Sequence, residues 1–490
     1  MRTSILLLAA LHSWTAPDRA ADKWIEARSA HFVVATNAGE RDAREILYRF
    51  ELFRAAFSSV FPRFRVDPGP PIVIIAARNE ATMKEWLPDE WATEGHMHPA
   101  GIYMGGLDRH YVILRLDVAS ADAPYVVLYH EYTHVLLHLN FSRLPVWLDE
   151  GLAEYFGFAS ASEKEVRIGL IAPGHLQVLR TDRPLPIAQL LTIGRESPYY
   201  NEADRASVFY AESWALVHYL MLNPEARQQQ LLSRFLASWE ASGDQVEAAR
   251  AAFGDLDRFG TTLTKYTNQA RFYQGVVKPS ASPVDKEYTI RPLTAGEVLA
   301  LRADFFVRHN RAEQAAPLLA EAVQLDPGLP VVHEALGIYH YRRGNLIAAD
   351  SEMLAAIRLG SKSFAPHYYH GLLLLRGGAG QPQGAARMEE ASASLERAIQ
   401  VNPDFAPAHD ALASAYERTP GKQPQAVGAA FQATKLAPST VQYAVHFAAV
   451  LMNAGRDADA HMVADRAEKL ATTPAEKSMV AALRAQFKTR

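Results

Sequence analysis

The second half of this chain repeats a pattern of small residues that suits a stack of paired helices. Ala322 and Ala356 stand 34 residues apart in similar surroundings, and the pattern returns at Ala398 and Ala467. Another small residue precedes each of these by seven positions: Ala315, Ala349, Ala391 and Ala460. Small residues on one helix face allow two helices to cross closely. A period of this length therefore predicts a solenoid of helical hairpins.

This pattern resembles tetratricopeptide repeats, in which a proline commonly closes a unit. Prolines stand in that place at Pro327, Pro403, Pro438 and Pro474. We expect about five units over residues 297–474, with a final helix that caps them up to residue 490. An insertion interrupts the third unit at residues 377–382, and the fourth has a longer turn near Pro420. The resemblance implies a protein partner on a concave surface; the alternative is an array that only braces its neighbour.

Residues 22–275 predict a different domain, of mixed α and β structure. Short apolar runs predict strands at residues 31–36, 71–76 and 111–116. Apolar residues at helical spacing predict a helix over residues 40–60 and an amphipathic helix over residues 205–222. Another helix is expected from Pro124, because proline fits the first helical position.

A break in composition separates the two halves. The stretch from Lys278 to Pro283 is rich in proline and serine, which is typical of a loop. We therefore predict a linker over residues 276–296.

The composition limits the classes of function. A formal net charge of −4 offers no basic surface to attract nucleic acid. The chain has no cysteine, which excludes disulfides, thiolate metal ligands and cysteine nucleophiles. A metal site must therefore be built from His, Asp and Glu.

The first 21 residues predict a short secretory signal. Arg2 precedes the apolar run from Ile5 to Leu11, and Pro17 follows it. Such a signal implies export to the periplasm or the cell exterior; without it the chain would be cytoplasmic. The run is too short to cross a bilayer, and no later segment has eighteen uncharged apolar residues. No transmembrane segment is expected apart from the signal peptide.

A five-residue motif, HEYTH, lies in the helix expected from Pro124. Residues four apart share a helix face, so His130 and His134 can reach one cation. Glu131 projects near that face, where it can act as a general base beside an open coordination position. Apolar residues flank the motif on both sides, so the helix is buried and its imidazoles need partners. Alone, the motif is a moderate signal for zinc.

A second segment can supply the third ligand. The stretch LPVWLDEGLAEYF, residues 144–156, predicts a helix opened by Pro145 and follows His134 closely. A catalytic zinc takes three protein ligands and keeps one position open, and Glu150 can complete that set. Glu154, one turn further, is placed to accept the remaining ring proton of a ligand histidine. The two segments together predict one Zn²⁺ ion.

Together these motifs resemble the gluzincin metallopeptidases, the clan that includes thermolysin and the M1 aminopeptidases. The segment WLDEGLAEYF is similar to the M1 segment in which the Glu before Gly binds zinc. More closely, residues 22–275 resemble the bacterial peptidase MA-like family through SAHFVVATN, YHEYTHVLLH, LPVWLDEGLAEYF and FYAESWALVHYLM. The resemblance implies an α+β zincin-like (thermolysin-like) catalytic domain before the all-α tetratricopeptide superhelix. It also implies that Glu150 is the third ligand and Glu131 the base.

Two departures from the M1 pattern narrow the expected activity. The spacer between His134 and Glu150 is shorter than in M1 enzymes. Those enzymes also carry a Gly-x-Met-Glu-Asn strand that grips the substrate amino terminus, and the nearest candidate, residues 101–106, has no glutamate. An endopeptidase is therefore favoured over an aminopeptidase.

Hydrolysis also needs a donor for the oxyanion. Clan relatives use a downstream Tyr or His, so Tyr210 is the best candidate and His218 a weaker one. The alternative for Tyr210 is ordinary aromatic packing beside Trp214.

Three further expectations concern the surroundings of the metal. His138 is interpreted as a packed or solvent-reaching residue, because catalysis needs an open coordination position. Asp149 points about 100° away from Glu150 on a helix and is interpreted as a surface or capping residue. The clan resemblance implies that the strand at residues 111–116 is the edge strand that pairs with an extended substrate.

These inferences combine into one predicted function. The chain is expected to be a zinc-dependent endopeptidase that hydrolyses peptide bonds of protein substrates with metal-activated water, while the repeats recruit a substrate or partner protein. The alternative is a catalytically degenerate, metal-binding scaffold that acts through its repeats. A zinc hydrolase acting on a non-peptide bond also stays open.

Overall fold

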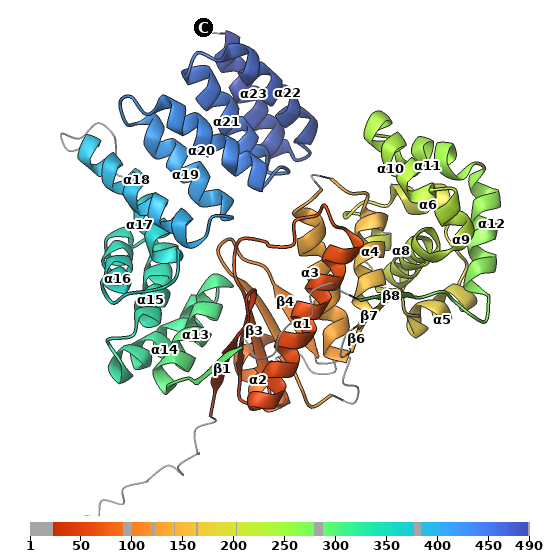
Figure 1. Ribbon diagram of the computed structural model, residues 1–490, viewed down its shortest axis with the longest axis horizontal. Helices are drawn as coiled ribbons and strands as arrows, with labels where there is room; N and C mark the ends of the chain where they lie inside the picture. Colours follow the sequence, from red (N-terminus) through yellow and green to blue (C-terminus); the bar gives the residue numbers. More distant parts are fainter. Residues whose placement is uncertain are drawn as a thin grey trace, which may run out of the picture.

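The computed structural model describes residues 23–91, 100–118, 123–141, 143–162, 165–201, 203–278, 288–376 and 384–488. The expected signal at residues 1–21 and the expected insertion at residues 377–382 lie outside this part of the chain. Figure 1 shows a central sheet with its helices, a helical part on one side and a helical array on the other. Within the described residues, no helix combines the length and apolarity needed to cross a membrane.

The central sheet has six strands in the order β4-β5-β3-β2-β1-β9. Their bounds are β1 Ile25–Arg28, β2 Phe32–Thr36, β3 Ile72–Ala77, β4 Gly101–Met104, β5 His110–Arg115 and β9 Thr289–Pro292. Strands β2, β3 and β5 are parallel, whereas β1, β4 and β9 pair antiparallel. The three strands predicted from the sequence correspond to β2, β3 and β5.

The expectation that residues 111–116 form the edge strand is wrong. Strand β5 lies between β3 and β4, and β4 is the edge. Gly101 pairs with Leu114 and Met104 with Tyr111, so a short hairpin covers the side of β5 that was expected to be free. Strand β4 has only four residues, too few for an alternating pattern to stand out in the sequence.

Both faces of the sheet are buried, as the unbroken apolar run of β3 requires. Ile72, Ile74 and Ala76 join the core on the side of α1 (Glu40–Val60) and α3 (Ala123–His138). The intervening Val73, Ile75 and Ala77 join a second core. That core also holds residues of α2 (Glu80–Trp86) and of the array helix α13 (Ala295–Arg308). The central sheet and the array therefore share one apolar core.

A helical part follows α3 and contains a small three-stranded sheet in the order β6-β7-β8. Its elements are α4 Val146–Gly157, β6 Ser160–Ser162, β7 Glu165–Ile168, α5 Pro173–Thr181, α6 Ile187–Thr192, α7 Pro198–Asn201, α8 Ala203–Leu222, α9 Pro224–Gln228, α10 Leu231–Ser242, α11 Gln245–Phe253, α12 Leu256–Thr267 and β8 Gly275–Val277. A short 3-10 helix, Pro88–Trp91, follows α2. The helix expected to be amphipathic is α8, but its central residues are buried on every side. Helices α4, α5, α7, α9 and α12 all pack against it.

The array consists of five helical hairpins and a final helix in the described residues. The hairpins are α13 with α14 (Ala312–Leu325), α15 (Pro330–Arg342) with α16 (Leu346–Arg358), α17 (Ala365–Arg376) with α18 (Gly384–Val401), α19 (Ala406–Glu417) with α20 (Gln423–Leu436), and α21 (Val441–Asn453) with α22 (Asp457–Leu470). Helix α23 (Pro474–Lys488) follows them. The eight alanines that define the sequence period are at most 1% exposed, so they lie where the helices cross.

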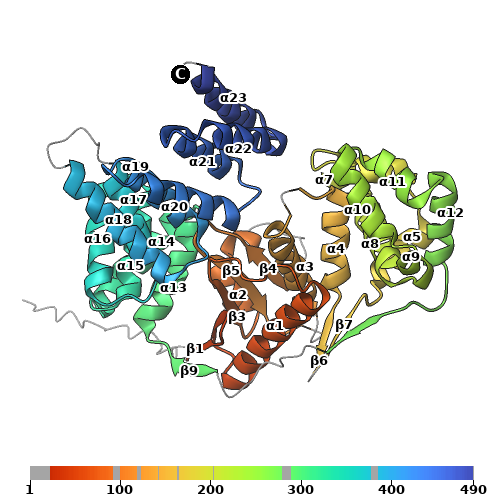
Figure 2. The same ribbon diagram turned by 45° about the horizontal axis from the view of Figure 1, so that its top comes forward.

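The predicted linker at residues 276–296 is more ordered than its composition indicated. It contains the end of β8 and all of β9, and α13 begins at Ala295. Strand β9 pairs with β1 through Ile290 and Ala27 (Figure 2). The chain therefore returns to the sheet before it enters the array.

A buried group of charges fastens α13 to the sheet. Asp304 of α13 accepts hydrogen bonds from Arg109 at 2.8 Å, from Arg308 at 2.9 Å and from the Tyr111 hydroxyl. Burial raises the pKa of Asp304, but Arg308 and Arg109 outweigh it and hold that pKa well below its usual range. Arg308 also pairs with Asp108. These charges compensate one another, so removing Asp304 would leave the buried Arg109 and Arg308 without the carboxylate that they share.

A second contact joins the array to the loop between α1 and β3. Asn402 donates to the Gly69 carbonyl at 2.6 Å, and Arg65 donates to the Leu436 carbonyl. The φ of Gly69 is +82°, and a Cβ there would lie 2.5 Å from the Asp404 carbonyl oxygen. Only glycine fits this position.

The same loop contacts the end of α3. Arg65 N donates to Asn140 Oδ1 at 2.7 Å, and Asn140 Nδ2 donates to the Arg65 carbonyl at 2.8 Å. The array, the loop and the end of α3 are thus held together.

Candidate metal centre

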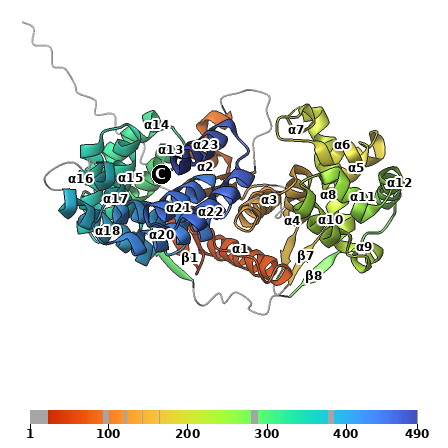
Figure 3. The ribbon, with the colours of Figure 1, turned by 90° about the horizontal axis from the view of Figure 1, so that it is seen from above.

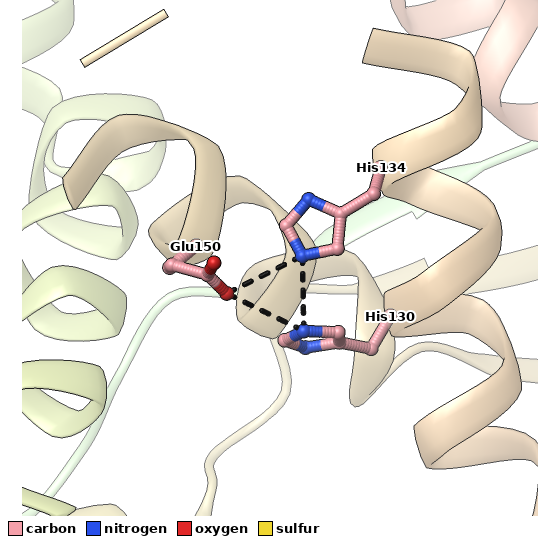
Figure 4. A group of neighbouring side chains, drawn as sticks. All are labelled: His130, His134 and Glu150. Carbon is pink, nitrogen blue, oxygen red and sulfur yellow. Dashed lines mark hydrogen bonds and ion pairs between the residues drawn. The ribbon is translucent and has the colours of Figure 1, made fainter. Parts of the chain in front are cut away.

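Helices α3 and α4 bring the three predicted ligands together (Figure 4). The Nε2 atoms of His130 and His134 lie 3.1 Å apart. Glu150 Oε2 lies 3.5 Å from His130 Nε2 and 3.3 Å from His134 Nε2. Seen from above, α3 and α4 lie between the array and the helical part (Figure 3).

These separations suit a tetrahedral cation. Zinc–nitrogen and zinc–oxygen bonds of about 2.0–2.1 Å place tetrahedral ligand atoms about 3.3 Å apart. The three donor atoms of His130, His134 and Glu150 are separated by 3.1–3.5 Å. The residues present therefore fit zinc without rearrangement of their side chains.

Two glycines of α4 set how closely it approaches its neighbours. A Cβ on Gly157 would lie 3.1 Å from the Val126 carbonyl oxygen and 3.2 Å from His130 Cβ. A Cβ on Gly151 would lie 2.4 Å from the Ser213 carbonyl oxygen in α8. Larger residues at either position would push α4 away from one neighbour, and Glu150 would move with it.

Each histidine has a carboxylate at its other nitrogen. His130 Nδ1 lies 3.4 Å from Glu154 Oε1, and His134 Nδ1 lies 2.9 Å from Asp149 Oδ1. An N–H directed at a carboxylate fixes the tautomer, so both Nε2 lone pairs are directed at the same point. The spacing of the two motifs had predicted this role for Glu154.

The interpretation of Asp149 as a surface or capping residue is wrong. Asp149 is 2% exposed and its second oxygen lies 2.8 Å from Arg195 Nη2 and 3.0 Å from His138 Nε2. Helix α4 packs between α3 and α8. The 100° rotation therefore turns Asp149 toward the second half of α3 instead of toward solvent. His138 does reach solvent, with its side chain 53% exposed.

A second group of three side chains, His134, His138 and Asp149, could also hold a metal ion. It would use His134 Nδ1, the nitrogen that lies against Asp149. The first group uses His134 Nε2, and its second histidine, His130, is more buried than the exposed His138 of the other group.

His175 joins the site without any signal in the sequence. This residue lies on α5, and its Nε2 is 2.9 Å from Glu154 Oε2. Glu154 is therefore held between His130 and His175. No motif surrounds His175, and only the packing of α5 against α8 brings it near.

Three carboxylates, those of Asp149, Glu150 and Glu154, lie against the two histidines and raise their pKa values. Burial lowers the pKa of His130, but hydrogen bonds to Glu150 and Glu154 outweigh it and raise that pKa to about 10. Burial is likewise outweighed at His134 by Asp149 and Glu150, which raise its pKa to about 9. Burial raises the pKa of Glu150, yet the two histidines bring it down to about 2. Such a group stabilises a positive charge at its centre.

Glu131, the predicted base, is half-buried and lies near Tyr103 of the edge strand β4. Burial, followed by the negative charge of Glu131, raises the pKa of Tyr103 well above its usual range. Burial lowers the pKa of His110 to about 4, so this ring is neutral. The Tyr103 hydroxyl can then donate to His110 Nδ1, 2.7 Å away.

The two oxyanion candidates have different outcomes. The prediction that His218 could donate to the oxyanion is wrong. His218 is fully buried, and its two ring nitrogens lie 2.7 Å from the Tyr266 hydroxyl and 2.9 Å from the Gly169 carbonyl. Tyr210 lies beside Tyr200, with ring centroids 5.9 Å apart. Tyr200 donates to Glu150 Oε1 at 2.9 Å, a contact that sequence reasoning missed. Burial and then Glu150 raise the pKa of Tyr210 well above its usual range, so its hydroxyl keeps its proton.

Comparisons with known proteins cover parts of the chain. A family described as "Protein of unknown function (DUF1570)" matches residues 127–238, the segment from α3 to α10 that holds all three ligands. No curated protein matches in sequence.

Similar solved structures each match less than half of the chain. TTC0263, a thermophilic TPR protein of Thermus thermophilus, is 19% identical; the match covers 40% of this chain and 97% of that one, with a TM-score of 0.30. PilF of Pseudomonas aeruginosa is 19% identical, with 40% and 91% covered and a TM-score of 0.32. MamA of Desulfovibrio magneticus RS-1 is 18% identical, with 36% and 96% covered and a TM-score of 0.31.

Proposed function

We propose that this protein is a zinc-dependent endopeptidase with a zincin-like, gluzincin-type catalytic domain, and that its array recruits a substrate or partner protein. One observation carries the proposal. The donor atoms of His130, His134 and Glu150 lie 3.1–3.5 Å apart, and the outer nitrogen of each histidine faces a carboxylate. A purely structural zinc site would not need a general base such as Glu131 beside an open coordination position.

The three ligands would hold one zinc ion. When bound, zinc polarises the scissile carbonyl and makes a water more acidic. Asp149 and Glu154 orient the two imidazoles through their Nδ1 atoms. Tyr200 orients Glu150 through the oxygen that faces away from the histidines.

Glu131 would move the proton. It follows His130 directly in α3, and a carboxylate in this position can take a proton from the attacking water and return it to the leaving amide nitrogen. Tyr210 keeps its proton and hydrogen-bonds Tyr200; its hydroxyl would turn from Tyr200 to donate to the oxygen of the scissile carbonyl.

Strand β4 would bind the substrate. Within the described residues it pairs only with β5, so its other edge can pair with an extended peptide. The segment at residues 101–106 has no carboxylate to hold a substrate amino terminus, which favours internal peptide bonds.

The test is cleavage of an unfolded protein by the full-length chain. We expect cleavage that a chelator abolishes and zinc restores, and Glu131→Gln should reduce it by about 10²-fold or more. Glu389→Gln, a change of an exposed glutamate on α18, is the matched control.

Metal content separates the enzyme from its alternative, a scaffold that acts through the repeats. We expect about one zinc per chain in the parent and in Glu131→Gln, and none in a variant with both His130→Ala and His134→Ala. If the parent binds about one zinc yet shows no cleavage above that of Glu131→Gln and of the chelated protein, the enzyme proposal fails and the scaffold explanation is correct.

A further inference from the structure

The outer side of the array has an apolar groove. The first helices of successive hairpins pack against one another, whereas the second helices are splayed apart. Residues of α20, α21 and α22 line a groove of about 560 Å³, with α21 at its base. Figure 1 shows these three helices near the carboxyl-terminal end of the array. The walls of the groove therefore belong to the second helices of the fourth and fifth hairpins.

The walls of the groove expose large apolar side chains. Phe431 of α20 is 54% exposed and Met462 of α22 is 64% exposed. Phe447 of α21 lies beneath them, with its ring centroid 5.8 Å from that of Phe431. A Cβ on Gly428 would meet nothing within 4 Å, so this glycine widens the groove instead of allowing close packing. Exposed apolar side chains gathered in this way indicate a docking surface.

The spacing along the walls matches a helix. On α20 the groove is lined from Val427 through Phe431 to Lys435, and on α22 from Asp459 through Met462 to Arg466. Each stripe covers two helical turns, about 12 Å. An amphipathic helix with apolar anchors at positions i, i+4 and i+7 fills a groove of this length.

One end of the groove is electrically balanced, and the other end is positively charged. Arg456 and Asp459 pair with each other at 2.6 Å and neutralise one end. Lys435 and Arg466 lie near the carboxyl ends of their helices, which run in the same direction because α21 returns between them. In the part of the chain that the structure describes, no ion pair joins either cation to a carboxylate. This end would attract an acidic side chain.

We propose that the groove between α20 and α22 binds an amphipathic helical segment of a partner protein, with apolar anchors against Phe431 and Met462 and an acidic residue against Lys435 and Arg466. The neighbouring Leu436 accepts a hydrogen bond from Arg65, in the loop that contacts the end of α3. A bound partner is thus held next to the catalytic-type domain. The proposal does not depend on zinc or on peptide cleavage.

The test is binding of a fluorescent 15-residue helical peptide to the full-length chain. The peptide carries Leu at i, i+4 and i+7 and two Glu beyond the last Leu; a second peptide has Lys in place of Glu. Anisotropy is measured with Glu131→Gln protein, so that the peptide is not cut. We expect the acidic peptide to bind at least about tenfold more tightly than the basic one.

Substitutions on the groove locate the site. Met462→Glu should weaken binding of the acidic peptide at least about tenfold, because it places a charge among apolar groups. Arg466→Glu should reverse the preference between the two peptides. Ile347→Glu is the matched control, since Ile347 is 87% exposed on α16, another second helix of the array.

Two results would overturn the proposal. One is equal binding of both peptides, or binding that Met462→Glu leaves unchanged. The other is self-association of the full-length chain, seen by sedimentation and abolished by Met462→Glu, which would make the groove an interface between two copies. Loss of cleavage alone would bear on the proposed function and not on the groove.

Discussion

Asp149 Oδ1 lies 2.9 Å from His134 Nδ1, while the other oxygen of Asp149 lies 2.8 Å from Arg195 Nη2. Asp149 thus connects a ligand histidine to the segment before α7, which carries Tyr200. The adjacent Glu150 is the third predicted ligand, so two consecutive residues of α4 contact His134 from different sides. Asp149 faces the Nδ1 atom of His134, and Glu150 faces its Nε2 atom.

Replacing Asp149 should weaken metal binding without removing a ligand. Asp149→Asn keeps the size of the side chain but removes the charge that orients His134, and we expect a zinc affinity lower by about 10–100-fold. Competition with a chromophoric chelator measures it. His138→Ala is the control, since this exposed residue contacts the same carboxylate; it should change the affinity much less. Equal losses would show that Asp149 acts only by holding the helices together.

Tyr200 and Tyr210 should have separable effects. Tyr200→Phe removes the donor to Glu150 Oε1 and should lower zinc affinity. Tyr210→Phe should leave zinc affinity unchanged and lower kcat by about 10²-fold, the usual loss of one oxyanion donor. For each variant, cleavage of the same peptide is measured with the protein saturated with zinc and with zinc limiting. Unchanged kcat in Tyr210→Phe would leave Tyr210 as a packing residue.

The buried charges of α13 should make the array necessary for stability. Asp304→Ala leaves Arg308 and Arg109 buried without their shared partner, and we expect a loss of about 3–5 kcal/mol in the free energy of unfolding. Urea denaturation followed by circular dichroism measures it. Glu85→Gln breaks an exposed ion pair with Arg302 at 2.8 Å, between α2 and the same helix α13. This control should cost less than about 1 kcal/mol.

Glu212 should make stability fall with rising pH. It is 3% exposed on α8, and burial raises its pKa to about 8, partly offset by the Leu185 amide. The folded chain therefore holds a proton that the unfolded chain loses near its ordinary pKa of 4.5. The stabilisation is complete below about pH 4.5 and is lost as the pH rises toward 8, with a slope of up to about 1.4 kcal/mol per pH unit.

The variant Glu212→Gln isolates this effect. Its amide carbonyl still accepts from Leu185 N, but it does not ionise. Unfolding free energies of both proteins between about pH 5 and pH 9 should diverge, with the variant more stable at high pH. Parallel curves would mean that Glu212 is ionised in the folded protein.

The sequence predicted those parts of the site that lie on regular spacing. His130, His134, Glu150 and Glu154 could be placed because a helix repeats every 3.6 residues and two motifs lie close together. Asp149, His175 and Tyr200 could not, since each reaches the site through the packing of one helix on another. The same holds for β4, whose four residues carry no period, and for β9, whose composition resembles a loop.

The repeats were readable for a similar reason. Their alanines recur at regular places in each unit, so about five hairpins could be counted from the amino-acid sequence alone, and five are present in the described residues. The repeat period does not predict how α13 attaches to the sheet, because that contact depends on Arg109 and Tyr111, which lie outside the repeats.

One face of β3 determines whether the amino-terminal half of this protein can be separated from the array. The core that includes the array covers Val73, Ile75 and Ala77. Removing the array would therefore expose an apolar face of the sheet to solvent. We therefore expect neither limited proteolysis nor gene truncation at residues 276–296 to release a free-standing amino-terminal half. A chimera with a foreign array should therefore be joined after Arg308.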